Sequence, residues 1–363
     1  MFPNISQKEL VEQLEAKKKC QYKLPTWFNT SNIYYANKRN IEQTSSEITA
    51  EYKARLIDGK SILDMTGGLG VDSFYFSKGM GAVTHCEVDQ NLSEIAAHNF
   101  KILGVNNCDF IAEDGMQFLK KNKGPFDWVY ADPSRRHDAK GKIFQLEDCE
   151  PNMPQNLDLI FEHTNSILIK TSPLLDLTLG ANKLKNVVQI HVVAVQNEVK
   201  EVLFVLKNKV EKPIKIKTVD LRKNEEVHFE FLWDEEKTTK VEYGDPEGYL
   251  YEPNAAILKA GGFNSIGKAF KLKKIAPHSH LYTSTERIDF PGRIFKIEQV
   301  IPYQKKQMKI FAGVKANVTT RNFPKTVAEI RKKYKILDGG DEYFFFTTAT
   351  NNRRILIRCI KVL

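Results

Sequence analysis

The sequence predicts an α/β protein whose first half forms an open, mainly parallel sheet with helices on both faces, followed by smaller α+β modules. Three observations support this prediction. From Lys60 to Val195, short apolar strands alternate with helical segments, which is typical of β-α-β units. The six residues 196–201 then separate two apolar runs, and because this connection is too short for a crossover, it predicts an antiparallel hairpin. After Lys207 the sequence changes to lysine-rich strands.

The elements of the first half follow from their local patterns. A charged helix is expected at about residues 8–19. Thr44 and Glu47 match a capping box, with Thr44 as N-cap and Glu47 three residues later, which predicts a helix to about Leu56. Hydrophobic periodicity then predicts strands at 61–65, 82–88, 109–112, 128–131, 166–170, 187–195 and 202–206, and helices at 71–77, 92–103 and 115–121.

The second half mixes strands with short helices. The expected strands are 214–221, 227–233, 293–297, 307–311, 343–348 and 354–360, and the expected helices are 255–259, 267–272 and 326–334. This order predicts a small α+β fold.

Composition narrows the class of protein. The 363 residues are 42% hydrophobic with a mean hydropathy of -0.40, and no stretch reaches the roughly 18 apolar residues of a membrane helix. The charged N-terminus lacks the apolar segment of a signal peptide. The five cysteines lie far apart without a Cys-x-x-Cys pair, so neither a metal site nor a disulfide framework is expected. We therefore expect a cytoplasmic protein with no membrane partner.

The charge is concentrated at one end of the chain. Residues 260–363 contain 21 Lys and Arg against 7 Asp and Glu, whereas the first 259 residues contain 33 against 38. A basic segment on an acidic body favours binding to a polyanion such as a nucleic acid. A solvated basic surface that keeps the protein soluble is the alternative.

A glycine-rich turn, Asp64–Gly70, follows the first predicted strand of the alternating region. Such a turn lets a ligand approach backbone that a Cβ atom would block. Asp64 at the strand end suits a positively charged sulfonium and amino group and disfavours a pyrophosphate. Gly68-x-Gly70-x-x-Ser73 also approaches the dinucleotide-binding pattern, so this segment alone leaves both ligands and a plain tight turn open.

Two later carboxylates strengthen the prediction of a nucleoside cofactor. Glu87 ends the second strand of the region, where a carboxylate can accept hydrogen bonds from ribose hydroxyls, and Asp114 ends the third, where it can accept from an adenine amine. Both follow strands whose carboxyl ends meet at the ligand-binding edge of an open α/β sheet.

The fourth strand of the region ends in Asp132 and Pro133. If the ligand is a sulfonium compound that donates its methyl group, the reaction needs a nucleophile held in line with the S–CH₃ bond. A carboxylate and a backbone carbonyl can accept hydrogen bonds from an amine and so hold it in that position. Arg135 and Arg136 are expected to grip a phosphate or a base edge. Lys170, just past the fifth strand, either contacts substrate or bridges to the acids of the sheet.

Together these motifs resemble the class I S-adenosylmethionine-dependent methyltransferases over about residues 45–207, with a Rossmann-like sheet. Glu42–Glu47, Asp64–Gly68, Asp132–Arg136 and Lys170–Pro173 resemble more closely a bacterial group of THUMP-like-domain methyltransferases. The resemblance implies S-adenosyl-L-methionine as cofactor.

The resemblance extends to the second half. Residues 249–291 resemble the ferredoxin-like segment of that group, and Lys315–Pro324 looks like the signature of its THUMP-like module. THUMP-type domains are associated with RNA modification, so the resemblance implies an RNA substrate, tRNA or rRNA. Related base methyltransferases carry Asp/Asn-Pro-Pro-aromatic, whereas this chain has Ser134 and Arg135 in the last two positions; a planar guanidinium can stack on a base instead.

These observations predict four segments and three sets of residues. The segments are an N-terminal helical accessory segment (1–44), a methyltransferase domain (45–208), linker strands with a ferredoxin-like domain (209–290) and a THUMP-like domain (291–363). The expected site residues are Asp132 and Pro133 for catalysis; Asp64, Thr66, Gly67, Gly68, Gly70, Glu87 and Asp114 for the cofactor; and Arg135, Arg136 and Lys170 for the substrate.

The expected function is N-methylation of a nucleobase in RNA. Two alternatives remain open at this point. One is a methyltransferase for a small molecule or protein, and the other is a non-catalytic RNA-binding protein with a relic cofactor pocket. A dinucleotide oxidoreductase fits the sequence least.

Overall fold

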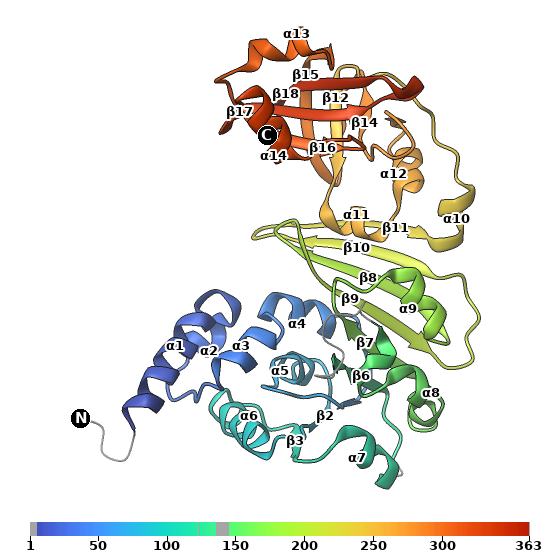
Figure 1. Ribbon diagram of the computed structural model, residues 1–363. Coiled ribbons are helices and arrows are strands. Elements are labelled where there is room, and N and C mark those ends of the chain that lie inside the picture. Colours follow the sequence, from blue (N-terminus) through green and yellow to red (C-terminus); the bar gives the residue numbers. More distant parts are fainter. Residues whose placement is uncertain (1–5, 123, 136–144, 363) are drawn as a thin grey trace. The chain divides into compact units, whose positions relative to one another are not determined.

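The computed structural model (Figure 1) describes residues 6–122, 124–135 and 145–362. The chain divides into two compact units, Met1–Val193 with Lys200–Lys212, and Ala194–Val199 with Pro213–Leu363. No helix among the described residues is long and apolar enough to cross a bilayer.

The first unit is built on an open sheet whose strands follow the order β8-β9-β7-β4-β1-β2-β3. The five strands from β7 to β3 are parallel, and β9 is antiparallel to β7. Their bounds are β1 Ser61–Asp64, β2 Ala82–Cys86, β3 Cys108–Ile111, β4 Trp128–Ala131, β7 Ser166–Thr171, β8 Val187–Val195 and β9 Glu198–Lys207. This order confirms the predicted Rossmann-like methyltransferase sheet with its closing hairpin. The hairpin turn is shorter than expected, because β9 already begins at Glu198.

The helices of this sheet begin where the sequence supplies a cap. The side chains of Asp89, Asp114, Asn152 and Asp176 accept hydrogen bonds from backbone N–H groups in the first turns of four helices. The helices are α4 Glu47–Ala54, α5 Val71–Ser77, α6 Gln90–Ile102, α7 Gly115–Lys121, α8 Met153–Phe161 and α9 Leu177–Lys183. Two short strands, β5 Ser134–Arg135 and β6 Cys149–Glu150, pair antiparallel beyond the end of β4.

The predicted capping box at Thr44 and Glu47 is wrong. Helix α4 begins at Glu47, its N-cap is Ser46, and the Ser46 side chain makes no capping hydrogen bond. The buried Glu47 carboxylate accepts hydrogen bonds from the Thr26 backbone N–H (2.6 Å), the Thr26 hydroxyl (2.6 Å) and the Tyr75 hydroxyl (2.8 Å). Thr26 and Tyr75 thus give the Glu47 carboxylate three hydrogen-bond donors, whereas a capping box would give it only the backbone N–H of the N-cap residue.

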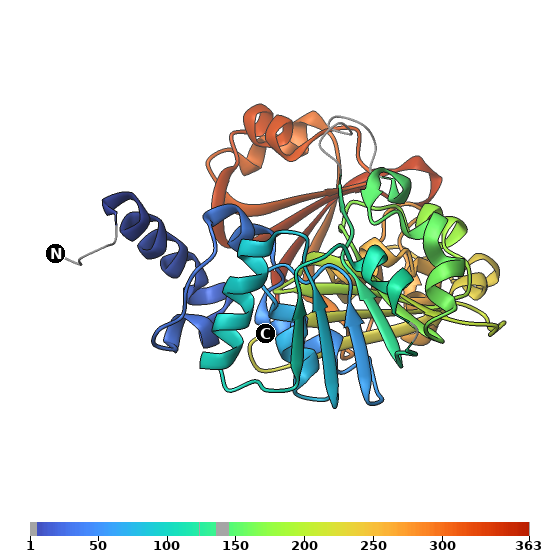
Figure 2. The same ribbon diagram turned by 90° about the horizontal axis from the view of Figure 1, so that it is seen from below.

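The N-terminal helices share a hydrophobic core with the α/β unit. Helices α1 (Gln7–Lys23), α2 (Pro25–Asn29) and α3 (Lys38–Gln43) lie beside α6 (Figures 1 and 2). Trp27 is 1% exposed, and its ring meets the ring of Phe74 edge-on with centroids 4.9 Å apart. Residues from α1–α3, α5 and α6 thus form one buried cluster.

The second unit contains a hairpin and a larger sheet. Strands β10 (Lys215–Leu221) and β11 (Glu226–Leu232) pair antiparallel. The seven-stranded sheet has the order β13-β14-β12-β15-β18-β17-β16, in which only β16 and β17 are parallel among the described strand pairs. Its bounds are β12 Tyr249–Pro253, β13 Lys273–Lys274, β14 Tyr282–Ser284, β15 Gly292–Pro302, β16 Lys315–Arg321, β17 Leu337–Thr348 and β18 Arg354–Lys361.

The helices of this unit agree only in part with the sequence patterns. The strand expected at 307–311 is wrong: these residues end α13 (Lys305–Met308) and form a 3₁₀ turn, Lys309–Phe311. Met308 and Phe311 are buried in one cluster, and their spacing of three places them on the same side of a helical turn. The other helices are α10 Trp233–Thr238, α11 Ala255–Ala260, α12 Phe263–Ala269 and α14 Val327–Tyr334.

Candidate active site

A cavity of about 420 Å³ lies at the carboxyl ends of the parallel strands of the first unit. It brings together six of the residues predicted from sequence, which are Thr66, Gly67, Gly68, Glu87, Asp114 and Asp132. Asp64, Gly70, Pro133 and Lys170 lie outside its lining. The backbone of Arg135 lies in β5 beside the cavity residue Ser134, and Arg136 lies outside the described residues.

The glycine loop owes its shape to close backbone packing. The Gly67 N–H donates to the Cys86 carbonyl (2.8 Å), and a Cβ atom on Gly67 would lie 2.3 Å from Nε2 of the buried His85. Gly68 and Gly70 have φ values of +56° and +84°, a region that side chains rarely adopt. Gly70 is also the N-cap of α5, so the loop leads directly into that helix.

Asp64 lies beneath this loop rather than in the cavity. Its side chain accepts hydrogen bonds from the Thr66 N–H (3.1 Å) and the Ser73 hydroxyl (2.6 Å), and the residue is 1% exposed. Burial raises the pKa of Asp64 to about 7, although the Ser73 hydrogen bond opposes this shift. The Asp64 carboxyl group therefore connects the glycine loop, through Thr66, to Ser73 in helix α5.

Glu87 and Asp114 do face the cavity. Glu87 Oε2 accepts from the Gly68 N–H (2.8 Å) and Oε1 from the Asp89 N–H (2.9 Å), which fixes the carboxylate against the loop. Each carboxylate oxygen has a second lone pair for a ligand hydroxyl. Asp114 uses Oδ1 to cap α7 through the Gln117 N–H (2.9 Å).

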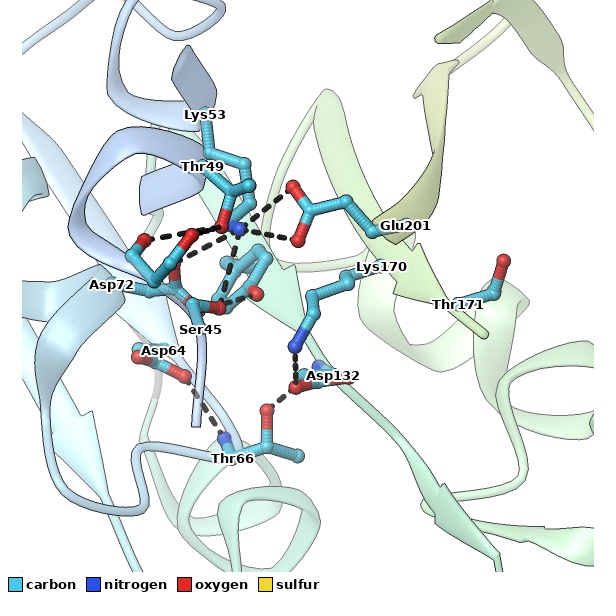
Figure 3. A network of polar contacts seen from close by, with 12 residues as sticks. Ser45, Thr49, Lys53, Asp64, Thr66, Asp72, Asp132, Lys170, Thr171 and Glu201 are labelled. Atoms are coloured by element: carbon cyan, nitrogen blue, oxygen red, sulfur yellow. Dashed lines mark hydrogen bonds and ion pairs between the residues drawn. The ribbon is translucent and has the colours of Figure 1, made fainter. Parts of the chain in front are cut away.

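Asp132 is held at both its backbone and its side chain (Figure 3). Its N–H donates to Thr66 Oγ1 (2.7 Å), which ties the end of β4 to the glycine loop. Its Oδ2 accepts a hydrogen bond from the Lys170 ammonium. Lys170 therefore bridges to an acid at the end of the neighbouring strand, which is one of the two roles expected for it from the sequence.

A buried charged cluster, which the sequence did not indicate, lies beside the cavity and includes the cavity residue Asp72. The Lys53 ammonium is fully buried and donates to both carboxylate oxygens of Glu201 (2.8 Å each), and it lies 3.2 Å from Asp72 Oδ1 (Figure 3). Asp72 Oδ2 accepts from the hydroxyls of Ser45 and Tyr130 (2.8 Å each). No local pattern reveals it, because Lys53 and Glu201 are 148 residues apart in sequence.

The cluster gives this side of the cavity an excess of negative charge. Burial alone would raise the pKa of Asp72, but the nearby Lys53 and Lys170 hold that pKa below its ordinary value. Burial raises the pKa of Glu201 despite its contact with Lys53. Asp72 and Asp132 line the cavity, whereas Lys53 and Lys170 do not. The arrangement suits a ligand that carries a positive charge.

The N-terminal segment supplies another wall that sequence reasoning missed. Asn40, Gln43, Thr44 and Ser45 line the cavity from α3 and the turn before α4. Their position depends on the packing of α1–α3 against α5 and α6, which residue patterns within the segment do not show.

Known proteins match this architecture in both halves. Family models match a ferredoxin-like domain at residues 249–291 and a THUMP domain-like segment at residues 292–361. A solved structure from Porphyromonas gingivalis W83, assigned as a methyltransferase, is 30% identical to this chain. The likeness covers 100% of this chain and 93% of that one, with a TM-score of 0.92. The chain belongs to the bacterial THUMP-like-domain methyltransferases.

A second relative matches a shorter part of this methyltransferase. It is an uncharacterized RNA methyltransferase from Mycoplasma mobile, 34% identical over 77 residues. The match spans 21% of this chain and 21% of the relative, about a fifth of that curated protein. The family resemblance and the fold predicted from sequence are confirmed.

Proposed function

We propose that this methyltransferase uses S-adenosyl-L-methionine to N-methylate a nucleobase in tRNA or rRNA. The observation that carries the proposal is the cavity that gathers the glycine loop, Glu87, Asp114 and Asp132 at one sheet edge. Its volume of about 420 Å³ lies within the usual range for cofactor sites.

The residues of the cavity fit the parts of this cofactor. Glu87, already fixed by Gly68 and Asp89, offers lone pairs to the ribose hydroxyls. Asp114 lies at the next strand end, in reach of an adenine amine. When bound, the cofactor supplies a methyl group activated by its positively charged sulfur. Thr66, Gly67 and Gly68 line the cavity directly, whereas Asp64 and Gly70 shape the loop from outside it.

Asp132 and Pro133 are proposed to position the acceptor amine. The Asp132 carboxylate and the Pro133 carbonyl accept hydrogen bonds from the amine N–H groups, which aims the nitrogen lone pair toward the cofactor. The Thr66 hydroxyl holds the Asp132 backbone, so the acceptor and the glycine loop keep a constant separation.

Three observations support RNA as the substrate. Residues 260–363 contain 21 basic against 7 acidic side chains, an excess that fits a polyanion. Residues 292–361 match a THUMP-like model, and a relative of part of the chain is named an RNA methyltransferase. Arg135 and Arg136 are proposed to contact the RNA phosphate or base. The exposed basic side chains of residues 260–363 are Lys268, Lys271, Lys273, Arg287, Lys296, Lys305, Lys306, Lys309, Lys315, Lys332, Lys333, Lys335, Arg353, Arg354 and Lys361.

The decisive experiment is nucleoside mass spectrometry of tRNA and rRNA from cells with and without the protein. We expect one methylated nucleoside to disappear with the gene and to reappear when purified protein and S-adenosylmethionine are added to the unmodified RNA. If every RNA nucleoside stays unchanged while a small molecule or a protein becomes methylated, the substrate assignment is wrong.

A variant pair tests the site. Asp132→Ala should retain cofactor binding, measured as thermal stabilisation by S-adenosylmethionine, and lose methyl transfer to RNA. The matched control is Asp158→Ala, which removes an exposed aspartate on α8 and should preserve both. Stabilisation by NADH without stabilisation by S-adenosylmethionine would overturn the cofactor assignment.

A further inference from the structure

Lys170 reaches the cavity only through Asp132. Strand β7 lies beside β4, with Ile169 paired to Ala131, so the Lys170 side chain lies next to the residue that follows β4. Its ammonium donates to Asp132 Oδ2, its side chain is 13% exposed, and it does not line the cavity. Asp132 does line the cavity, and its side chain is 34% exposed.

The surroundings of Lys170 keep it charged. Burial would lower the pKa of Lys170, but the negative charges of Asp132, Asp72 and Glu201 outweigh burial and raise that pKa above its ordinary value. Glu201 lies on β9, the strand that pairs with β7 on its other side. Lys170 is therefore an ammonium group across the physiological pH range. One carboxylate near it, Asp132, follows the neighbouring strand β4, and another, Glu201, lies on the other neighbour, β9.

We propose that Lys170 is the positioning residue for Asp132. By holding Oδ2, it leaves Oδ1 as the carboxylate oxygen that meets the substrate amine, while Thr66 holds the Asp132 backbone. The carboxylate then has one orientation, and so has the lone pair of an amine bound to it. This inference rests on the proposed function, and it assigns Lys170 a different role from direct contact with the substrate.

The magnitude follows from the sensitivity of transfer reactions to alignment. A misplacement of about 1 Å costs on the order of 100-fold in rate, whereas binding of the cofactor depends on other residues. A residue that touches substrate would mainly change KM when removed, because it contributes to binding before the reaction. A residue that acts through Asp132 changes kcat.

The test compares Lys170→Met, Lys170→Arg and a control in the full-length protein. The control is Lys207→Met, since Lys207 lies on β9 and donates to Ser166 (2.8 Å) at the opposite end of the same strand pair. We expect Lys170→Met to lower kcat by about 100-fold, with KM for RNA and the affinity for S-adenosylmethionine within about threefold of wild type. Lys170→Arg, which retains the charge, should recover most of the lost kcat, and Lys207→Met should not lower it.

A structural measurement makes the result independent of the RNA. Crystal structures of wild type and Lys170→Met with bound S-adenosylhomocysteine should show the Asp132 carboxylate turned away from its wild-type position in the variant. An unmoved carboxylate, or a raised KM with unchanged kcat, overturns the positioning role. If wild type methylates no RNA, the proposed substrate is wrong, and the two crystal structures still decide the role of Lys170.

Discussion

Replacing Lys53 by methionine should strongly destabilise the first unit. The Lys53 ammonium is fully buried and is bonded to both oxygens of Glu201, with Asp72 Oδ1 3.2 Å away. Methionine fills a similar volume but leaves two buried carboxylates without the ammonium group that contacts both of them. Removing one partner of a buried ion pair costs about 3–5 kcal/mol. For a unit of this size that corresponds to a fall in melting temperature of roughly 6–20 °C.

The loss should depend on pH. Without Lys53, the folded-state pKa of Glu201, which burial already raises, should rise further, and the pKa of Asp72 should rise from its lowered value. A carboxyl group of this kind costs stability as pH rises through its folded pKa, and protonation relieves the cost at low pH. The difference in melting temperature between wild type and Lys53→Met should therefore be larger at pH 8 than at pH 5.

Differential scanning calorimetry measures this difference, and two further variants control it. Lys185→Met removes an exposed pair with Asp158, whose partners are 65% and 82% exposed, and should change stability by less than about 1 kcal/mol. The double variant Lys53→Met with Glu201→Leu removes both charges and should recover part of the loss. A Lys53→Met protein that melts within about 2 °C of wild type at pH 7 would refute the reasoning.

Three further predictions concern the loop, its support and the basic surface. Because the pKa of Asp64 is raised from 3.8 to about 7, wild type should lose stability as pH rises across that window, and Asp64→Asn should show a flatter dependence in calorimetry. Gly67→Ala places a Cβ atom against His85 and should abolish thermal stabilisation by S-adenosylmethionine; the control Gly79→Ala meets no atom within 4 Å and should retain it. Charge reversal on α14 should weaken RNA binding in filter assays at least tenfold and flatten its salt dependence, whereas the same reversal of three exposed lysines in the first unit should not. The set at the end of α14 is Lys332, Lys333 and the C-cap residue Lys335, and the control set is Lys8, Lys18 and Lys120.

Elements whose cause is local were predictable from the sequence. The bounds of α5 (Val71–Ser77) and β4 (Trp128–Ala131) agree with prediction, because a glycine start and a short apolar run define them. The 3₁₀ turn at Lys309–Phe311 was misread as part of a strand, because Met308, Lys309 and Ile310 alternate as strand residues do, whereas the structure buries Met308 and Phe311 and leaves Ile310 exposed. Over so few residues the hydrophobic period of a strand cannot be distinguished from that of a helical turn.

The candidate site was predictable as a set of strand ends but not as a set of contacts. Asp64 was placed correctly at the end of β1, yet the sequence does not show that its carboxyl group accepts a hydrogen bond from Ser73. Asp72, which lines the cavity, reads in sequence as an ordinary acid in the first turn of a helix. The Lys53–Glu201 pair joins distant positions, so it follows from tertiary structure alone.

The pairing of β12 with β15 has a consequence for how the second unit can be altered. Tyr249–Pro253 and Gly292–Lys296 form one antiparallel ladder, so the ferredoxin-like and THUMP-like segments share backbone hydrogen bonds across their common boundary. A chain cut at residue 291 would expose an unpaired strand edge, which invites aggregation. The two segments should therefore be removed or transferred as one piece, and a graft of this unit onto another enzyme must begin before β12.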